Sequence, residues 1–198
     1  MAMKIAVQSK GRLKEQSLAF LRSLGLKFTL SDRNLITKCD NYDLEILFLR
    51  DDDIPEYVNR AVVDLGIVGR NVAEEKSCAT KVASSLKFAE CRLVIAVPKN
   101  SEIKDLSDLE GERIATSYPK ITAQFLQKNG VKASIIPITG SVEIATGMNL
   151  ADAICDITQS GDTLKENNLK ELITVMNSEA VLIKSPSFNL KNFELWRS

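Results

Sequence analysis

The sequence predicts an α/β protein of two lobes, each built around its own mainly parallel sheet, with a central cleft between the lobes. Short apolar runs alternate with segments whose apolar residues have helical spacing, which is typical of parallel strands joined by helices. The strands are too many for one small sheet in 198 residues. Ligands of open α/β sheets usually bind where such strands end, so we expect the binding site in the cleft.

The first part of the chain supplies strands and helices in alternation. Gly25 follows the helically spaced leucines of the first helix, where a glycine ends a helix well. Pro55 stands at the start of the second helix, where its missing N–H group costs no hydrogen bond. We expect strands at residues 4–7, 44–49 and 64–69, and helices at residues 13–24 and 54–62.

The same alternation continues through the second part of the chain. We expect strands at residues 93–97, 113–116, 133–138, 152–157 and 172–175, and helices at residues 119–128, 142–148 and 163–167. A strand at residues 180–184 and a helix at residues 188–196 would then return to the first lobe. Domain I is therefore expected to comprise residues 1–89 and 179–198, and domain II residues 90–178.

The composition excludes several classes of function. The 26 Lys and Arg residues balance 26 Asp and Glu residues, which gives no argument for binding nucleic acid or a membrane. Histidine is absent, so a hydrolase that pairs Ser or Cys with His and a His-ligated zinc site are both excluded. The four cysteines form no C-x-x-C pair, and we see no leader or membrane span, so we expect reduced thiols in a cytoplasmic protein.

The most informative segment is residues 151–164. An apolar strand reaches Asp156, and a Ser160-Gly161-x-Thr163 turn then opens a helix. Free N–H groups at a helix start, a glycine that permits close approach and two hydroxyls make a phosphate cradle. A carboxylate beside it could accept hydrogen bonds from two vicinal hydroxyls, and the pair fits a ribose 5-phosphate. The alternative is an ordinary turn with Ser160 as the helix N-cap, and Asp162 must point away from a phosphate or face a cation.

Three other segments have the residue types of an anion or nucleotide site. Lys10-Gly11-Arg12 lies between a strand and a helix, which favours anions, although a solvated turn is the usual alternative. The acids of Arg50-Asp51-Asp52-Asp53 could help to hold Mg²⁺ or could cap the following helix, and we favour capping for Asp53. Tyr118, in Ser117-Tyr118-Pro119, could stack on a base or be a half-buried ring without a ligand. Gly66 and Gly69 could admit a ligand or only form a turn.

Residues 143–164 resemble the signature of the ATP phosphoribosyltransferase family, which runs from a Glu to a small residue, an Ile or Val, an Asp and a closing S/T-G-x-T-L/M. The matching residues are Glu143, Ala151, Ile154, Asp156, Ile157, Ser160, Gly161, Thr163 and Leu164. The sequence departs from the pattern at Asn149, where the family has Gly, and Asn is the next best residue for a left-handed backbone. Further matching segments extend the resemblance from about Lys4 to Lys184; they include residues 10–13, 64–69, 91–93, 113–119 and 140–143.

The resemblance implies a periplasmic-binding-protein-like (type II) fold and a glycosyltransferase activity. The reaction would transfer the 5-phosphoribosyl group of phosphoribosyl pyrophosphate (PRPP) to N1 of ATP and release pyrophosphate, as the first step of L-histidine biosynthesis. Arg12 and Arg33 would be catalytic groups that approach the pyrophosphate. The implied PRPP-binding residues are Glu143, Asp156, Gln159, Ser160, Gly161, Asp162 and Thr163. The implied ATP-binding residues are Lys10, Gly11, Arg50, Gly69, Ser117 and Tyr118.

The resemblance also implies Mg²⁺ as cofactor, with its protein ligands unassigned, and the short form of the enzyme. The chain ends where long forms continue into a histidine-binding domain, and short forms work with a regulatory subunit similar to a histidyl-tRNA synthetase. We therefore expect homodimers within a hetero-oligomer, specifically a hetero-octamer. The rival interpretation is a non-catalytic binding module, since two-lobed folds of this kind resemble periplasmic solute receptors and effector domains of transcription regulators. That interpretation needs an export signal or a DNA-binding segment, and we find neither.

Overall fold

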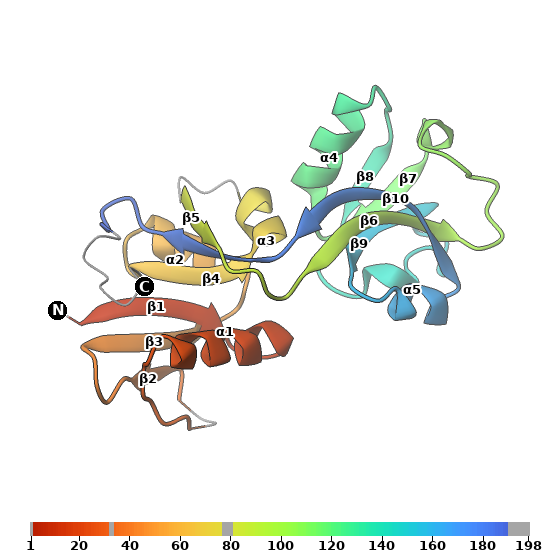
Figure 1. The fold of residues 1–198 in the computed structure, drawn as a ribbon. Helices are drawn as coiled ribbons and strands as arrows, with labels where there is room; N and C mark the ends of the chain where they lie inside the picture. Colours follow the sequence, from red (N-terminus) through yellow and green to blue (C-terminus); the bar gives the residue numbers. More distant parts are fainter. Residues whose placement is uncertain (1, 32–33, 77–80, 190–198) are drawn as a thin grey trace. The chain divides into compact units, whose positions relative to one another are not determined.

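The chain forms two compact units, Met1–Ala89 with Glu179–Ser198, and Glu90–Ser178. The structure is a computed structural model that describes residues 2–31, 34–76 and 81–189. Each unit has its own sheet and its own hydrophobic clusters, one on each face of the sheet. Figure 1 shows both sheets and the helices that cover them. We call the two parts unit 1 and unit 2.

The sheet of unit 1 has six strands in the order β2-β3-β1-β4-β11-β5. Its centre is parallel, because β1 pairs in parallel with both β3 and β4. Ile5, Ala6 and Val7 of β1 are fully buried, as expected for a strand that is covered on both faces. The strands are β1 (Met3–Gln8), β2 (Ile36–Lys38), β3 (Leu44–Leu49), β4 (Leu65–Gly69), β5 (Lys81–Ser85) and β11 (Ala180–Lys184).

Helices cover both faces of this sheet (Figure 1). Helix α1 (Arg12–Ser23) packs Leu18 and Leu21 on one face, and α2 (Ile54–Asn59) and α3 (Arg70–Glu75) pack on the other. Gly25, two residues beyond the end of α1, has a φ of +87°, so the glycine stop predicted for this helix is observed. The start of α2 carries Pro55 as predicted.

Gly66 lies where α2 presses on β4, and we expect a Gly66→Ala variant to be destabilised by about 1 to 3 kcal/mol. An added Cβ would lie 2.6 Å from Cγ2 of Ile54 and 3.0 Å from Cγ2 of Val58. Both neighbours are β-branched and have stiff side chains, so the helix itself would have to move. Chemical denaturation measures the loss. Gly147→Ala is the control, since its Cβ would meet only the Ile144 carbonyl oxygen, at 3.6 Å; equal stability of both variants would contradict this account.

The sheet of unit 2 has five strands in the order β10-β6-β9-β7-β8. Strand β9 is central and lies parallel to β7 and antiparallel to β6. Helix α4 (Pro119–Lys128) packs Ile121 and Leu126 on one face. The 3₁₀ turn η2 (Val142–Ile144) and helix α5 (Asp162–Glu166) pack on the other (Figure 1). The strands are β6 (Cys91–Pro98), β7 (Arg113–Thr116), β8 (Ser134–Pro137), β9 (Ala153–Thr158) and β10 (Leu169–Ser178), and a second 3₁₀ turn is η1 (Ser107–Leu109).

The predicted fold class, α/β with two sheets, is confirmed, but both sheets are mixed where the sequence predicted mainly parallel ones. Strand β11 runs antiparallel to β4 and β5, and β10 runs antiparallel to β6. Strands β10 and β11 flank the point at which the chain returns from unit 2 to unit 1, and β2 is also antiparallel to its neighbour β3. The elements β2, β5, α3 and η1 were not predicted; β2 and η1 have only three residues each, too few to show a period.

The helix predicted at residues 142–148 is wrong beyond its first turn. Only η2 is helical, and the chain continues as turns to Asn149, which has a φ of +61°. The Leu150 N–H donates to the Ala145 carbonyl at 2.9 Å, which folds the segment back on itself. The left-handed backbone predicted at Asn149 is therefore present. Most of the helix predicted at residues 188–196 falls outside the described part of the chain.

Candidate functional site

The carboxyl ends of three neighbouring parallel strands carry the candidate residues of unit 1. Residues Lys10, Gly11 and Arg12 follow β1, Arg50 follows β3, and Gly69 ends β4. The pairing of Gln8 with Leu49 and the hydrogen bond from the Ser9 N–H to the Leu49 carbonyl, at 2.7 Å, bring the first two segments together. The topology thus collects at one edge of the sheet residues that are up to 59 positions apart in the sequence (69 − 10).

The cations at this edge are available to a ligand. Lys10, Arg12 and Arg50 are exposed, and they form no hydrogen bond or ion pair through their side chains within residues 2–31, 34–76 and 81–189. Gly11 is the N-cap of α1 with a φ of +85°, a backbone that favours glycine and lets Arg12 begin the helix. Arg33, the other predicted catalytic arginine, lies outside the described residues.

The acids that follow Arg50 do not converge on one point. Asp52 pairs with Lys76 at 3.4 Å, and Asp53 is the N-cap of α2 but makes no side-chain capping bond. Burial, followed by the neighbouring charge of Asp52, raises the pKa of Asp51. Within the described ranges no group of three His, Cys, Asp or Glu residues could hold a metal ion. A metal cage made by protein groups alone is therefore not seen in this part of the chain.

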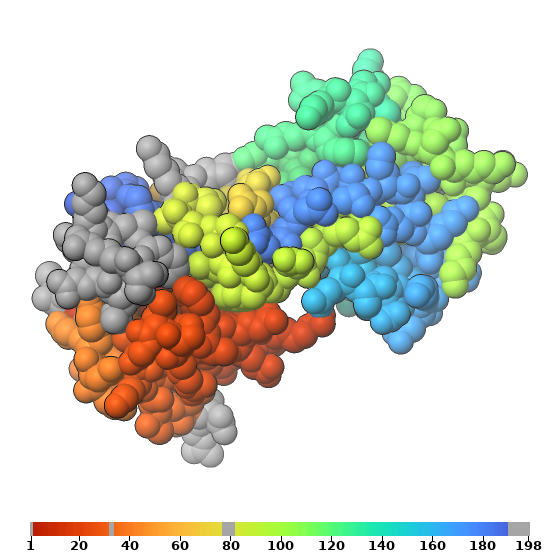
Figure 2. Space-filling model, viewed as in Figure 1, coloured from red at the N-terminus to blue at the C-terminus, as the bar shows by residue number. Residues whose placement is uncertain are grey.

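The predicted phosphate loop, Gln159–Thr163, is a surface bend of unit 2 between β9 and α5. Four of its side chains, those of Gln159, Ser160, Asp162 and Thr163, are exposed, and this part of the chain, coloured blue, forms part of the surface in Figure 2. Gly161 has a φ of +83°, and an added Cβ would have no neighbour within 4 Å, so the backbone itself requires glycine. The N–H groups of Gly161, Thr163 and Leu164 donate to no acceptor in the described structure. An anion could therefore bind without displacing an existing bond to them.

The polar side chains of the loop interact with one another. The Ser160 hydroxyl donates to the Asp162 carboxylate at 2.7 Å, and Lys165 Nζ lies 3.7 Å from the same carboxylate. Asp162 thus faces a cation, which is one of the two arrangements that the sequence left open. Gly161, and not Ser160, is the N-cap of α5, so the alternative of a simple serine cap is wrong.

Asp156 and Glu143 form the acidic part of the candidate site. Strand alternation places Asp156 on the face of Ile154, against which Val142 of η2 and the following Ala145 pack; η2 also carries Glu143. Burial raises the pKa of Asp156 to about 6; the N–H of Ile157, at 2.8 Å from Asp156 Oδ1, opposes this, and the charge of Glu143 adds to it. A carboxylate that is costly to ionise is typical of functional sites.

The Ser117-Tyr118 turn lies at the end of β7, the parallel neighbour of β9. The Ser117 hydroxyl donates to the Ile138 carbonyl at 2.8 Å, and Tyr118 packs against the hydrophobic cluster under α4. The Tyr118 ring is half-buried, which is compatible with both predicted alternatives. The sequence did not point to Thr116, whose buried hydroxyl binds both this turn and β9.

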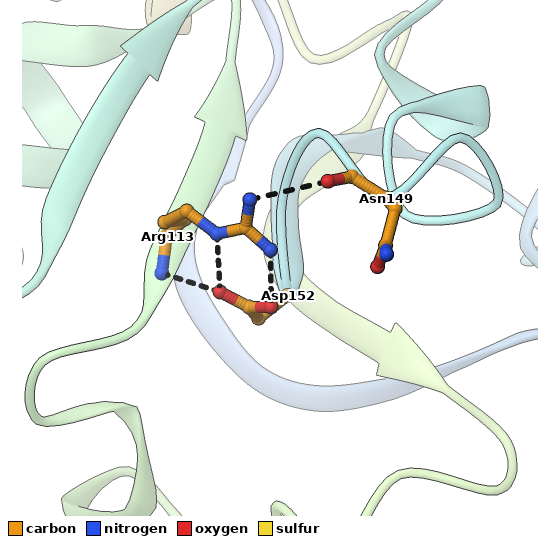
Figure 3. Close-up of polar contacts among 3 residues, drawn as sticks. All are labelled: Arg113, Asn149 and Asp152. Atoms are coloured by element: carbon orange, nitrogen blue, oxygen red, sulfur yellow. Dashed lines mark hydrogen bonds and ion pairs between the residues drawn. The ribbon is translucent and has the colours of Figure 1, made fainter.

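Arg113 clamps the loop that precedes β9, and the sequence did not predict this contact (Figure 3). Its guanidinium donates to both carboxylate oxygens of Asp152, at 2.9 and 2.8 Å, and its backbone N–H donates to the same carboxylate at 3.0 Å. Arg113 Nη1 donates to the Asn149 carbonyl at 3.1 Å. The left-handed residue in the signature segment is therefore held by a charged side chain from β7.

We expect an Arg113→Met variant to unfold at a clearly lower temperature than the wild type, because it leaves the Asp152 carboxylate without its charged partner. Hydrogen bonds from Arg113 lower the pKa of Asp152 to about 2. The stabilisation is thus present above the ordinary value of 3.8 and is lost as the pH falls towards 2, so the difference between variant and wild type should shrink in acid. Thermal unfolding from pH 7 to pH 2.5 measures this.

Arg92→Met is the matched control, because Arg92 and Glu171 are 41% and 30% exposed, against 42% and 29% for Arg113 and Asp152. The control pair lacks the fork geometry and the bond to a loop carbonyl, so its loss should stay below about 1 kcal/mol. Equal losses of folding stability in the two variants would show that the contacts of Arg113 stabilise the fold no more than an ordinary surface ion pair.

The two units define a class of fold, the two-unit α/β architecture that also occurs in solute-binding proteins. A substrate-binding protein of an amino acid ABC transporter superposes with a TM-score of 0.63 at 15% identity, over 98% of this chain and 88% of that chain. The family model for ATP phosphoribosyltransferase (HisG) matches residues 50–196. The chain belongs to the ATP phosphoribosyltransferase family.

Individual relatives agree with this family. The ATP phosphoribosyltransferase of Phocaeicola vulgatus is 48% identical over 193 residues, and that of Bacteroides thetaiotaomicron is 51% identical over 181 residues. These matches cover 98% and 91% of this chain, but 68% and 64% of the relatives, so the chain spans about two thirds of their length. The ATP phosphoribosyl transferase (HisG:HisZ) complex from Thermotoga maritima contains a chain with a TM-score of 0.81 and 31% identity, over 98% of this chain and 93% of that chain.

None of the helices in the described ranges has the length and the apolar character needed to cross a membrane.

Proposed function

We propose that this chain transfers the 5-phosphoribosyl group of PRPP to N1 of ATP and releases pyrophosphate, the first step of L-histidine biosynthesis. The observation that carries the proposal is the exposed bend at Ser160–Thr163, which has free N–H groups. The partly buried Asp156 lies just before this bend, near the end of β9. A 5-phosphate fits donors of this kind, and the ribose hydroxyls fit the carboxylates of Asp156 and Glu143.

The reaction needs no base before the attack. Adenine N1 has a free lone pair, so it can form the new bond to the anomeric carbon while the bond from that carbon to pyrophosphate breaks. The chain, which has no histidine, therefore has to orient two polyanions and to stabilise the charge that leaves with pyrophosphate. Arg12 supplies a forked donor to the leaving group, as we also propose for Arg33. Lys10, Gly11, Arg50, Gly69, Ser117 and Tyr118 are proposed to contact ATP.

The described residues fit Mg²⁺ that is held largely by substrate phosphates. No cage of three acidic groups exists among them, whereas Mg²⁺ commonly keeps several waters and uses one or two carboxylates with the phosphates of its substrate. Asp156 and Glu143 are close enough for the charge of Glu143 to raise the pKa of Asp156, and a pair of carboxylates suits the cation. Mg²⁺ would neutralise phosphate charge; Asp156 and Glu143 would orient the ribose beside it.

Incubation with ATP, PRPP and Mg²⁺ tests the proposal, with product followed by ultraviolet absorbance. We expect product that depends on both substrates. A thermal shift with PRPP or ATP but without product, when a regulatory subunit is also supplied, would select the rival binding module.

A Thr163→Val variant tests the loop itself. Because the hydroxyl of Thr163 is exposed in the bend, its loss should weaken PRPP binding about tenfold without a large change in stability. Calorimetric titration with PRPP measures the change. Thr174→Val is the control, since it removes a hydroxyl that bonds Glu171 at 2.9 Å outside the bend. Unchanged PRPP affinity in Thr163→Val would remove this hydroxyl from the site.

We further propose that the chain acts in the cytoplasm as a homodimer assembled with a separate regulatory subunit, in a hetero-octamer. The support is the Thermotoga maritima chain, which this chain matches over 93% of its length and which is part of a HisG:HisZ complex. The alternative is regulation within one longer polypeptide, which the greater length of the curated relatives favours. The two alternatives can be separated by light scattering of the protein purified from its own cells, with mass spectrometry of every component. A second polypeptide supports a separate regulatory subunit, and a single longer chain contradicts it.

A further inference from the structure

We infer that Thr116 is a positioning residue for the transfer reaction. Its side chain joins the strand of unit 2 that is proposed to bind ribose to the turn that is proposed to bind ATP. This inference rests on the proposed function. Thr116 is the last residue of β7 and is fully buried. A hydroxyl in such a place is costly unless it is hydrogen-bonded, so its partners are informative.

The Thr116 hydroxyl uses both its donor and an acceptor position. It donates to the carbonyl of Cys155 at 2.6 Å, and it accepts the backbone N–H of Tyr118 at 2.9 Å. The Cys155 carbonyl belongs to the peptide group that leads directly into Asp156. The Tyr118 N–H belongs to the turn that starts α4. One buried oxygen atom therefore connects the two segments.

The position of Thr116 in the sheet explains why a side chain makes this connection. The pairing of β7 with β9 ends at Thr116 and Cys155, so no later residue of β7 continues the ladder towards Asp156. Beyond this point the chain turns away into the Ser117-Tyr118 segment, and the Thr116 hydroxyl bridges the divergence. Without it, the peptide before Asp156 and the start of α4 would each lose a buried hydrogen bond.

Thr122, whose hydroxyl lies next to that of Thr116, supplies a natural comparison. It is also fully buried, and its hydroxyl donates to the Tyr118 carbonyl at 2.7 Å and lies 3.4 Å from the Thr116 hydroxyl. It therefore supports the turn, but it makes no hydrogen bond to β9 that the structure describes. The two threonines share burial and size, and they differ in the hydrogen bond to the peptide before Asp156.

The experiment compares Thr116→Val with Thr122→Val and Thr116→Ser, using turnover with ATP, PRPP and Mg²⁺ and calorimetric titration with each substrate. Valine keeps the volume and the β-branch of threonine and removes the hydroxyl. We expect Thr116→Val to lower kcat/KM about tenfold or more and to weaken both PRPP and ATP binding, after correction of each value for the folded fraction measured by unfolding. Thr116→Ser, which keeps the hydroxyl, should retain most of the wild-type kcat/KM and substrate affinity.

Thr122→Val should lower the melting temperature by a similar amount and leave PRPP affinity at the wild-type value. If Thr116 has only a structural role, the two valine variants should change substrate affinity equally, or folded Thr116→Val should have the wild-type kcat/KM and dissociation constants. Either result overturns the inference. Should Thr116→Val fail to fold, Thr116→Cys carries the same test, because a thiol of similar size is a weak hydrogen-bond donor. Absence of product with the wild type, when a regulatory subunit is also supplied, contradicts the proposed function instead, and the calorimetric constants for the two substrates still decide the inference.

Discussion

An Asp156→Asn variant is expected to be more stable than the wild type above pH 6 and almost inactive. Burial raises the pKa of Asp156 from 3.8 to about 6, so the folded state disfavours the ionised carboxylate. Well below pH 3.8 the group is protonated in both the folded and the unfolded state, and it does not affect stability. Between pH 4 and pH 6 the unfolded chain releases the proton first, so the wild type loses stability as the pH rises, and above pH 6 the loss is complete.

Asparagine cannot ionise, so the variant escapes this loss. We expect a gain of roughly 1 to 2 kcal/mol at pH 7.5, after allowance for the partial exposure of the side chain, and little gain at pH 4. Denaturant titrations at both pH values measure it. Glu102→Gln, an exposed acid of the same unit, is the control and should show no such dependence on pH.

Activity should change in the opposite direction. In the proposed site the carboxylate accepts hydrogen bonds from the ribose hydroxyls, and an amide has one acceptor oxygen fewer and carries no charge. We expect kcat/KM for PRPP to fall about 100-fold or more. For the same reason the wild type should bind PRPP less tightly as the pH falls below 6. An Asn variant with normal kcat/KM would argue against Asp156 as part of the site. A variant that is less stable than the wild type at pH 7.5 would argue against a carboxylate that is costly to ionise in the folded state.

An Arg12→Ala variant is expected to lower turnover about 100-fold while ATP binding changes little. Arg12 starts α1 as an exposed cation without a described partner, so the fold loses almost nothing when its side chain is removed. Its proposed partner, pyrophosphate, gains charge as the bond to the anomeric carbon breaks, and an interaction that strengthens in the transition state affects kcat more than binding.

Steady-state kinetics and calorimetric titration with ATP separate the two effects. Arg22→Ala is the control, because Arg22 lies in the last turn of the same helix and stacks over Phe28, 4.8 Å from the ring centroid. That variant should lose some stability and keep its turnover. Unchanged turnover in Arg12→Ala, or a loss of ATP affinity as large as the loss of turnover, would remove Arg12 from the leaving-group role.

Much of the fold was predictable because its elements follow local patterns. Helix α4 was predicted with its exact bounds, since Pro119 starts it and Asn129-Gly130 ends it. The strands β1, β3, β7 and β11 were also found, as apolar runs between polar turns. The error at residues 142–148 has a physical reason: apolar spacing suggested a helix, but the bond from Leu150 to the Ala145 carbonyl folds the chain back after η2.

The sequence alone determined the family, the expected sugar-phosphate loop and its need for glycine, because these depend on residue types at fixed short spacings. Tertiary structure decided which distant residues meet. The parallel pairing of β1 and β3 brings Lys10 and Arg50 to one edge, and the packing of η2 on β9 brings Glu143 close enough to perturb Asp156. The hydroxyl of Thr116 and the guanidinium of Arg113 acquire their partners 39 residues away only when the sheet forms, and no local pattern records that pairing.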